Sequence, residues 1–240
     1  MKGRRQYKYQ FLILQLILYI SFLYLDITGG SILLSNYIKF TVVALCFLYV
    51  LLIKANGETE KTLLFLRLAL FFTLVSDMLI LLLDCYFYGV LTFIIAQQLH
   101  GIRISLLGKR FNHIKNLIKR LLYQLSVSLA VCLLLWKLNV SLNALLAASI
   151  FYFSCILSNT IRSLHLAANV RERRIKYFAA GLVLFLLCDI NVGLFNMSDF
   201  LPVGPVYGKI YLISSVLMWT FYAPSQVLIA LSGDKCRNKI

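Results

Sequence analysis

Charged residues are scarce in this sequence. Only 14% of its 240 residues are charged, whereas 61% are hydrophobic. A water-soluble domain of this size normally carries about a quarter charged residues, so most of this chain is expected to be solvated by lipid. Acidic residues are the rarer kind, with 9 Asp and Glu against 24 Lys and Arg. An acid inside an apolar stretch therefore stands out.

The cysteines lack the spacing of a metal site or a disulfide framework. They are Cys46, Cys85, Cys132, Cys155, Cys188 and Cys236. None of them forms a C-x-x-C motif, and no histidine cluster accompanies them. We therefore expect isolated thiols in membrane helices, with neither a zinc site nor a structural disulfide. No metal or organic cofactor is implied.

A cleavage site for a secretory signal is also missing. The basic segment MKGRRQYKYQ precedes an apolar stretch, as in a signal peptide, but no small-residue A-x-A site follows. We therefore predict a retained first membrane helix. No loop is long or polar enough for a separate soluble domain, so we expect a multi-pass protein of a cell membrane, in particular a bacterial inner membrane.

Eight apolar stretches are close to the ~20 residues that cross a bilayer as a helix. They cover residues 9–27, 37–53, 63–84, 86–107, 121–138, 141–161, 177–195 and 209–232. The sequence therefore predicts an all-α, polytopic membrane helix bundle with eight transmembrane helices. It forms a single integral membrane domain over residues 1–240, and no oligomeric state is predicted.

The positions of Lys and Arg predict the orientation of this bundle. If the N-terminus lies inside, all but three of the 24 basic residues fall on the inner side; the exceptions are Lys39, Lys137 and Lys209. This is the positive-inside pattern, and it predicts that both termini lie on the inner side, N-in and C-in. Because the charges are spread over short inter-helix segments, the excess charge points to membrane topology and not to nucleic acid as a partner.

Two carboxylic acids interrupt apolar runs. Asp77 lies in LVSDMLILLLD and Asp189 lies in LVLFLLCDINVGL. A charged residue at the middle of a membrane costs roughly 2.5–3.5 kcal/mol on insertion scales, so such an acid is a functional-site hypothesis, with an internal polar lock as the alternative. At a rise of ~1.5 Å per residue, each acid is expected about 10 Å below the outer boundary. The two acids would therefore share one level.

Other polar residues follow the i, i+3, i+4 spacing that places side chains on one face of a helix. The candidate supporting residues are Gln97, His100, Tyr152, Asn159, Tyr222 and Gln226. Each of these, taken singly, also fits a plain helix-packing interface. Lys39, near the outer start of the stretch 37–53, has three possible roles. It can extend to the headgroups, pair with Asp26, or help to hold a lipid phosphate.

Four stretches, in order along the chain, match the pattern of one family. They are NYIKFTVVAL, LALFFTLVSDMLILLLDCYFYGVLTFIIAQQLH, YFAAGLVLFLLCDINVGLF and WTFYAPSQVLIALS. The residues at the marked positions of that pattern are Lys39, Asp77, Gly89, Phe93, Cys188, Asp189, Tyr222 and Gln226. The four stretches occur in the same order as in the family and extend along most of the chain.

The chain in this way resembles the YhhN-like lysoplasmalogenases, eight-helix membrane enzymes that cleave the vinyl ether bond of lysoplasmalogens. The resemblance implies a hydrolase of ether lipids whose substrate is a lysophospholipid in the bilayer. It implies that Asp77 and Asp189 are the catalytic aspartate dyad. The products would be a fatty aldehyde and glycerophospho-ethanolamine or glycerophospho-choline.

Three positions depart from the family pattern and leave other functions open. Ser76 stands where the family commonly has Gly, and Gln97 and His100 stand where it commonly has His and Tyr. Gln does not exchange protons as His does, so a catalytically degenerate lysolipid-binding protein is one alternative. A proton-coupled transporter of lipids or small molecules is another, because membrane acids also serve in proton relays. The G-x-G-D and Y-D signatures of an intramembrane aspartyl protease are absent.

The chemistry of a vinyl ether fits a pair of acids. Hydrolysis begins with protonation of the outer alkene carbon and gives an oxocarbenium ion that water captures. The step needs a protonated carboxylic acid and a second group that stabilises the cation and deprotonates water. Desolvation and mutual repulsion can keep one of two nearby acids protonated while the other stays ionised. In this hypothesis Lys39 attracts the lipid phosphate, and Gln97, Asn159 and Gln226 orient water or the carboxyl groups.

Overall fold

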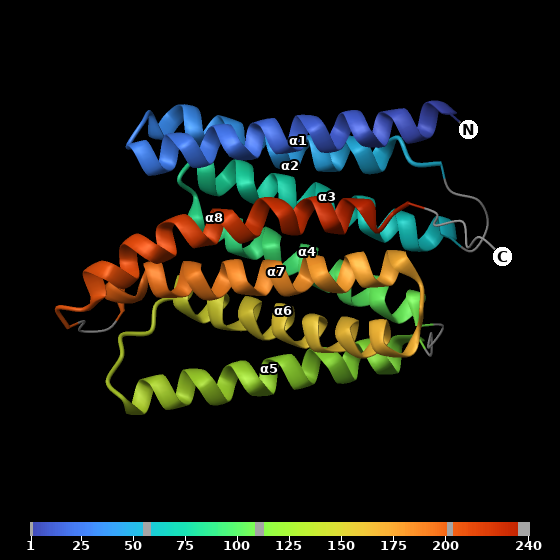
Figure 1. The fold of residues 1–240 in the computed structure, drawn as a ribbon. Helices are drawn as coiled ribbons and strands as arrows, with labels where there is room; N and C mark the ends of the chain where they lie inside the picture. The colour runs from blue at the N-terminus through green and yellow to red at the C-terminus, as the bar shows by residue number, and fades with distance from the viewer. Residues whose placement is uncertain (1, 55–58, 109–112, 201–203, 235–240) are drawn as a thin grey trace.

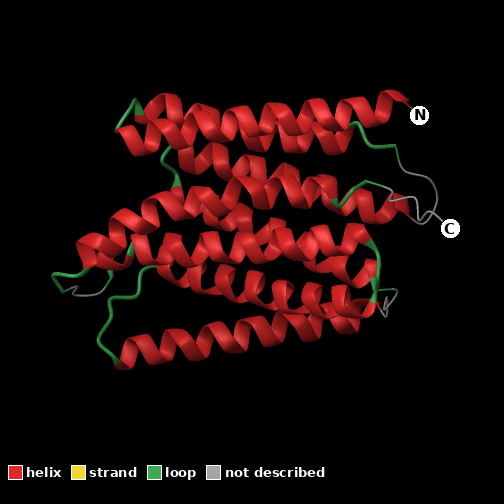
Figure 2. Ribbon diagram, viewed as in Figure 1, coloured by secondary structure: helices red, strands yellow, loops and turns green. Residues whose placement is uncertain are grey.

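The described part of the computed structural model, residues 2–54, 59–108, 113–200 and 204–234, is a bundle of helices (Figure 1). The helices are α1 (Lys2–Thr28), α2 (Ile32–Leu51), α3 (Thr59–Leu81), α4 (Tyr86–Leu107), α5 (His113–Lys137), α6 (Ala144–Asn169), α7 (Arg173–Phe195) and α8 (Tyr207–Leu231), with a 3-10 turn at Met197–Asp199. These ranges contain no strand (Figure 2). All eight α-helices are long and apolar enough to cross a membrane. The prediction of an all-α bundle with eight candidate spans is confirmed.

Several helices extend beyond the apolar stretches that predicted them. α1 begins at Lys2 and not at residue 9, α5 begins at His113 and not at 121, and α6 ends at Asn169 and not at 161. The added segments are polar or basic. Helix formation does not require apolar side chains, and Lys and Arg are good helix formers, so a spanning helix continues into the headgroup layer. An apolar stretch chosen by hydropathy alone therefore predicts too short a helix where the helix continues into a polar or basic segment.

Two predicted limits were too wide by three residues, and local structure explains both. α3 ends at Leu81 and not at residue 84, because Asp84 has a φ of 52°, which does not continue a right-handed helix. α6 begins at Ala144 and not at residue 141. Its N-cap is Asn143, whose side-chain oxygen accepts a hydrogen bond of 2.8 Å from the Leu146 backbone amide.

The order of packing places α3, α4, α7 and α8 in the middle of the bundle. α3 packs on α4, α7 packs on α8, and α6 packs on both α4 and α7. α5 lies at the edge of the bundle against α6, and α1 lies at the opposite edge against α2 (Figure 1). α5 exposes a row of large apolar side chains that includes Leu122, Leu125 and Leu129, as expected for a helix that faces lipid.

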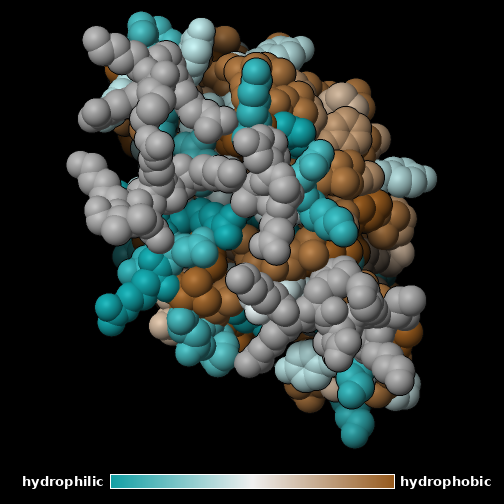
Figure 3. Space-filling model, turned by 90° about the vertical axis from the view of Figure 1, so that its right-hand side faces the viewer, coloured by the Kyte–Doolittle hydropathy of each residue, from teal (hydrophilic) through white to brown (hydrophobic). Residues whose placement is uncertain are grey.

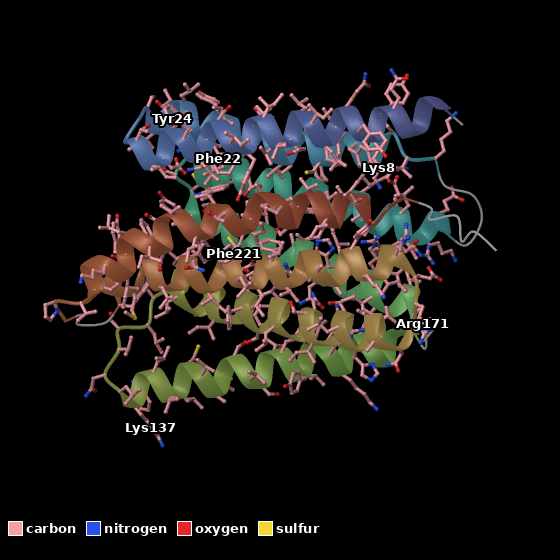
Figure 4. The ribbon with its side chains drawn as sticks, viewed as in Figure 1. Lys8, Phe22, Tyr24, Lys137, Arg171 and Phe221 are labelled. Carbon is pink, nitrogen blue, oxygen red and sulfur yellow. The ribbon has the colours of Figure 1, made fainter. Side chains whose placement is uncertain are left out.

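The start of α1 and the end of α8 lie at the same end of the bundle (Figure 1). Lys8 and Arg171 are at this end, whereas Lys137 is at the other (Figure 4). Figure 3 looks onto the first end and shows hydrophilic side chains gathered across it, beside hydrophobic ones. We call this the basic end. That it faces the inside of the cell stays a prediction.

Candidate active site

Asp77 is buried between α3, α4 and α8. Its side chain is 3% exposed, and the hydroxyl group of Tyr222 on α8 donates a hydrogen bond of 2.7 Å to its Oδ2. The neighbouring Ser76 donates a hydrogen bond of 2.6 Å to the carbonyl oxygen of Gly89 on α4. A Cβ atom at Gly89 would overlap the side chain of Ile80, so glycine permits this close approach. The first acid therefore lies where α3 and α4 are tied together.

Asp189 is held in the same way, by a tyrosine from another helix. It is half-buried on α7, and the hydroxyl group of Tyr152 on α6 donates a hydrogen bond of 2.8 Å to its Oδ2. Asp77 lies four residues before the end of α3 and Asp189 six residues before the end of α7, which corresponds to about 6 and 9 Å along the helices. Each acid thus has one tyrosine from a different helix as its donor.

Aromatic rings connect the two tyrosines. Phe93 on α4 contacts the rings of Tyr152 and Phe185, with centroid distances of 5.6 and 5.8 Å. Phe185 on α7 in turn contacts Tyr222 at 5.3 Å. Because Tyr152 donates to Asp189 and Tyr222 donates to Asp77, these ring contacts connect the partners of the two acids. We call Asp77, Asp189, Tyr152 and Tyr222 the aspartate site. Within the described ranges, no direct hydrogen bond joins its two carboxyl groups.

Lys39 pairs with Asp26, which is one of the three roles considered for it. The Nζ of Lys39 lies 2.9 Å from Oδ2 of Asp26, and the hydroxyl group of Ser35 donates to the same carboxylate at 2.6 Å. The Lys39 ammonium also lies 4.6 Å from the centroid of the Trp219 ring, which contacts Tyr222 at 5.4 Å. Lys39 therefore adjoins the aspartate site through one tryptophan.

The buried amides have other partners than the carboxyl groups. Asn159 donates hydrogen bonds of 2.7 and 3.1 Å to the backbone and side-chain oxygens of Gln97. Gln226 donates to the hydroxyl group of Ser225 at 3.3 Å. Nε2 of Gln97, Oε1 of Gln226 and Oδ1 of Asn159 are buried and have no partner among the residues described. These three amide atoms are therefore free to form a hydrogen bond with water or a ligand.

His100 is fully buried beside Phe178, with ring centroids 5.5 Å apart. It follows Phe93 by seven residues on α4, or about 10 Å along the helix. Tyr152 and Tyr222 therefore contact the acids. Gln97 and His100 lie about one and two helical turns beyond Phe93 on α4, toward the basic end. In the described part of the chain, no group of three His, Cys, Asp or Glu side chains is placed to hold a metal ion.

Some residues near the candidate sites were not given a functional role from the sequence. Trp219 lies three residues before Tyr222 on one helical face, and that spacing was the available signal. From the sequence, the arginines Arg103, Arg120 and Arg162 served only to predict which end of the bundle faces the inner side of the membrane. The structure places Arg103 inside the bundle, 2% exposed, where it donates to the hydroxyl and carbonyl oxygens of Ser232 at the end of α8.

Fold and site together define a polytopic helical membrane protein with two acids, each hydrogen-bonded to a tyrosine, in one aromatic cluster. The family model of the YhhN family matches residues 34–233. This match covers most of the chain and includes both acids, so the chain belongs to the YhhN family. Comparisons with curated proteins and with solved structures gave no match.

Proposed function

We propose that this protein is a membrane hydrolase that cleaves the vinyl ether bond of lysoplasmalogen. The products are a fatty aldehyde and glycerophospho-ethanolamine or glycerophospho-choline. The observation that carries this proposal is the pair of acids, Asp77 and Asp189, placed in one aromatic cluster inside an eight-helix bundle. Membership of the YhhN family supports the same class of reaction.

In the proposed reaction one carboxyl group gives a proton to the outer alkene carbon. The resulting oxocarbenium ion is stabilised by the second, ionised carboxylate, which also takes a proton from the attacking water. The hemiacetal then collapses to aldehyde and alcohol. Two coupled acids titrate as a pair, so the roles of donor and base are assigned to the pair and not to either residue alone.

The two tyrosines position the carboxyl groups for this step. Each tyrosine donates to Oδ2 of its acid, and no residue of the described ranges donates to Oδ1 of either acid. Oδ1 is therefore the atom through which each acid would meet the substrate or water. The rings of Phe93 and Phe185 lie between the tyrosines and would face the developing cation, which aromatic faces attract.

The supporting residues have more distant roles in this proposal. Gln97 and Gln226 would orient water through their unpartnered amide atoms, while Asn159 holds Gln97 in place. Lys39 acts with Asp26 to fix Trp219 against Tyr222, and its charge attracts the substrate phosphate.

The test is to incubate the purified protein with a lysoplasmalogen and to measure fatty aldehyde. Wild-type protein is expected to form aldehyde, and Asp77→Asn and Asp189→Asn are each expected to lose at least 10²-fold in rate, because general acid–base assistance is typically worth 10²–10⁴-fold. Asp199→Asn, at an exposed acid of the 3-10 turn, is the control and should keep the wild-type rate.

Other outcomes of this assay would support the rival functions. Binding of the lysolipid without aldehyde would favour a degenerate binding protein, which Gln97 at the family's histidine position suggests. Uptake into vesicles that depends on a proton gradient would favour a transporter. Aldehyde formed equally by both aspartate variants would contradict the proposed mechanism.

A further inference from the structure

A second polar cluster lies between α4, α5 and α6, apart from the aspartate site. Arg120 on α5 and Arg162 on α6 approach the same glycine, Gly101 on α4. Nη1 of Arg162 donates to the carbonyl oxygen of Gly101 at 3.4 Å. A Cβ atom at Gly101 would lie 2.6 Å from Cζ of Arg120, so this guanidinium group packs directly on the glycine. We call Arg120, Arg162 and Gly101 the arginine site.

The positive charges of the arginine site have neutral partners. Arg120 donates to the backbone and side-chain oxygens of Gln98 at 3.3 and 2.6 Å, and Arg162 donates to the hydroxyl group of Ser105 at 2.7 Å. No acidic side chain within the described ranges forms an ion pair with either arginine. Both guanidinium groups approach Gly101, so their like charges lie near each other. Two partly buried like charges without a counterion are costly, and an anion between them would remove that cost.

Unpartnered donors point to the same kind of ligand. Nε of Arg120 and Nε2 of Gln124 are buried and have no acceptor among the residues described. Both side chains bond to Gln98, and Gln124 is fully buried. A buried donor without an acceptor is costly, so two of them beside two arginines indicate a missing group that is rich in acceptors.

We propose that the arginine site binds a phosphate group. Guanidinium groups match phosphate with paired N–H donors, and basic pockets between membrane helices are known to hold lipid headgroups. Arg120 and Arg162 each lie seven residues from a helix end, about 10 Å along the axis, which their long side chains can bridge toward the headgroup layer. The phosphate of a phospholipid and that of a soluble compound share this chemistry.

The site lies at the lipid-facing edge of the bundle. α5 is the outermost helix on this side (Figure 1), and its neighbouring residues Leu122, Tyr123 and Leu125 are exposed. A lipid could therefore reach Arg120 sideways. The proposal does not depend on ether hydrolysis, because none of the residues of the arginine site belongs to the aspartate site.

Binding of defined probes to the full-length protein in detergent tests this proposal. The probes are dihexanoyl phosphatidic acid and inorganic phosphate, and the readouts are native mass spectrometry and the midpoint of thermal unfolding. Wild-type protein is expected to show saturable stabilisation by at least one probe. The double variant Arg120→Gln/Arg162→Gln should weaken the apparent affinity for it at least tenfold. Arg171→Gln, at an exposed arginine of the same end, should not.

A second pair of variants separates placement from charge. Gly101→Ala keeps both arginines but displaces the Arg120 guanidinium, and it is expected to weaken binding several-fold. Gly108→Ala, near the end of the same helix and in ordinary contact with its neighbours, is its control. These single substitutions also keep the test decisive if the double variant does not fold.

The outcomes identify the source of the phosphate or overturn the site. Stabilisation by phosphatidic acid alone would identify a lipid phosphate, and equal stabilisation by inorganic phosphate would identify a soluble compound; both support the proposal when they depend on Arg120 and Arg162. No binding of either probe, or equal binding by wild type and by all arginine-site variants, would overturn it.

Discussion

At the scale of single residues, the hydroxyl groups of Tyr152 and Tyr222 explain how two acids are tolerated in this bundle. An acid in the middle of a membrane costs roughly 2.5–3.5 kcal/mol. A hydrogen bond that involves a charged group contributes about 1.5–3 kcal/mol. One hydrogen bond from a tyrosine, at 2.7 Å for Asp77 and 2.8 Å for Asp189, therefore offsets much of the cost when the acid is ionised.

The tyrosines are therefore expected to affect the rate through the acids that they hold. Tyr152→Phe and Tyr222→Phe keep the ring packing but remove the hydrogen bond, so each should lower the rate of aldehyde formation about 10- to 100-fold, the equivalent of 1.5–3 kcal/mol. The measurement is steady-state kinetics with a lysoplasmalogen. Tyr24→Phe, at an exposed position of α1 (Figure 4), is the control. If both tyrosine variants kept the wild-type rate, the hydroxyl groups of Tyr152 and Tyr222 would have no role in the mechanism.

The sequence was sufficient to identify candidate residues, but not to predict which residues form hydrogen bonds with one another. Asp77 and Asp189 stand out because each interrupts an apolar run. Tyr152 and Tyr222 were candidates by their helical spacing, but nothing in the sequence assigned one to each acid. The Tyr222–Asp77 hydrogen bond joins residues 145 positions apart, and such a contact depends on how two distant helices are rotated. For Lys39, the sequence offered three roles, and only the packing of α1 against α2 distinguished the pairing with Asp26.

At the scale of elements, α7 and α8 form the most extensive contact between two helices of the described chain. A Cβ atom at Gly181 on α7 would lie 2.7 Å from Cγ1 of Ile229 and 3.0 Å from the carbonyl oxygen of Ser225, both on α8. Glycine therefore lets the two backbones approach, as small residues do between membrane helices. Because α7 carries Asp189 and α8 carries Tyr222, this approach also sets the width of the aspartate site.

Gly181→Ala is expected to destabilise the protein. Overpacking typically costs about 1–3 kcal/mol. For a chain of this size, that corresponds to a fall of about 2–12 °C in the midpoint of thermal unfolding. The measurement is circular dichroism of the protein in detergent during heating. Gly193→Ala on the same helix is the matched control, because a Cβ atom there meets nothing within 4 Å, and it should keep the wild-type midpoint or raise it slightly. Equal midpoints for both variants would contradict the role given to Gly181.

At the scale of the whole molecule, basic residues mark one end of the bundle and set the expected topology. Lys8 and Arg171 lie at the end where α1 begins and α8 ends, and Lys137 lies at the opposite end (Figure 4). An even number of spans puts both ends of the described chain on one side of the membrane. The positive-inside rule predicts that this is the inner side, which would put the aspartate site nearer the outer leaflet.

Cysteine labelling in intact cells tests this topology. In a variant without the native cysteines, Ser141→Cys between α5 and α6 is expected to react with a membrane-impermeant maleimide, because it lies at the end opposite the basic end. Arg171→Cys between α6 and α7 should react only after the cells are opened. Both positions are exposed, so accessibility from one side of the membrane is the difference measured. The reverse pattern would place the basic end outside.

By itself, the sequence determined the number of helices and the two acids, because hydrophobic length and isolated charges are local features of a chain in lipid. It did not determine which faces of the helices meet. A helix that is apolar on most sides has little amphipathic signal to orient it. The pairing of Gln97 with Asn159 and the meeting of Arg120 and Arg162 at Gly101 were therefore decided only by the tertiary structure, where close packing selects one rotation of each helix.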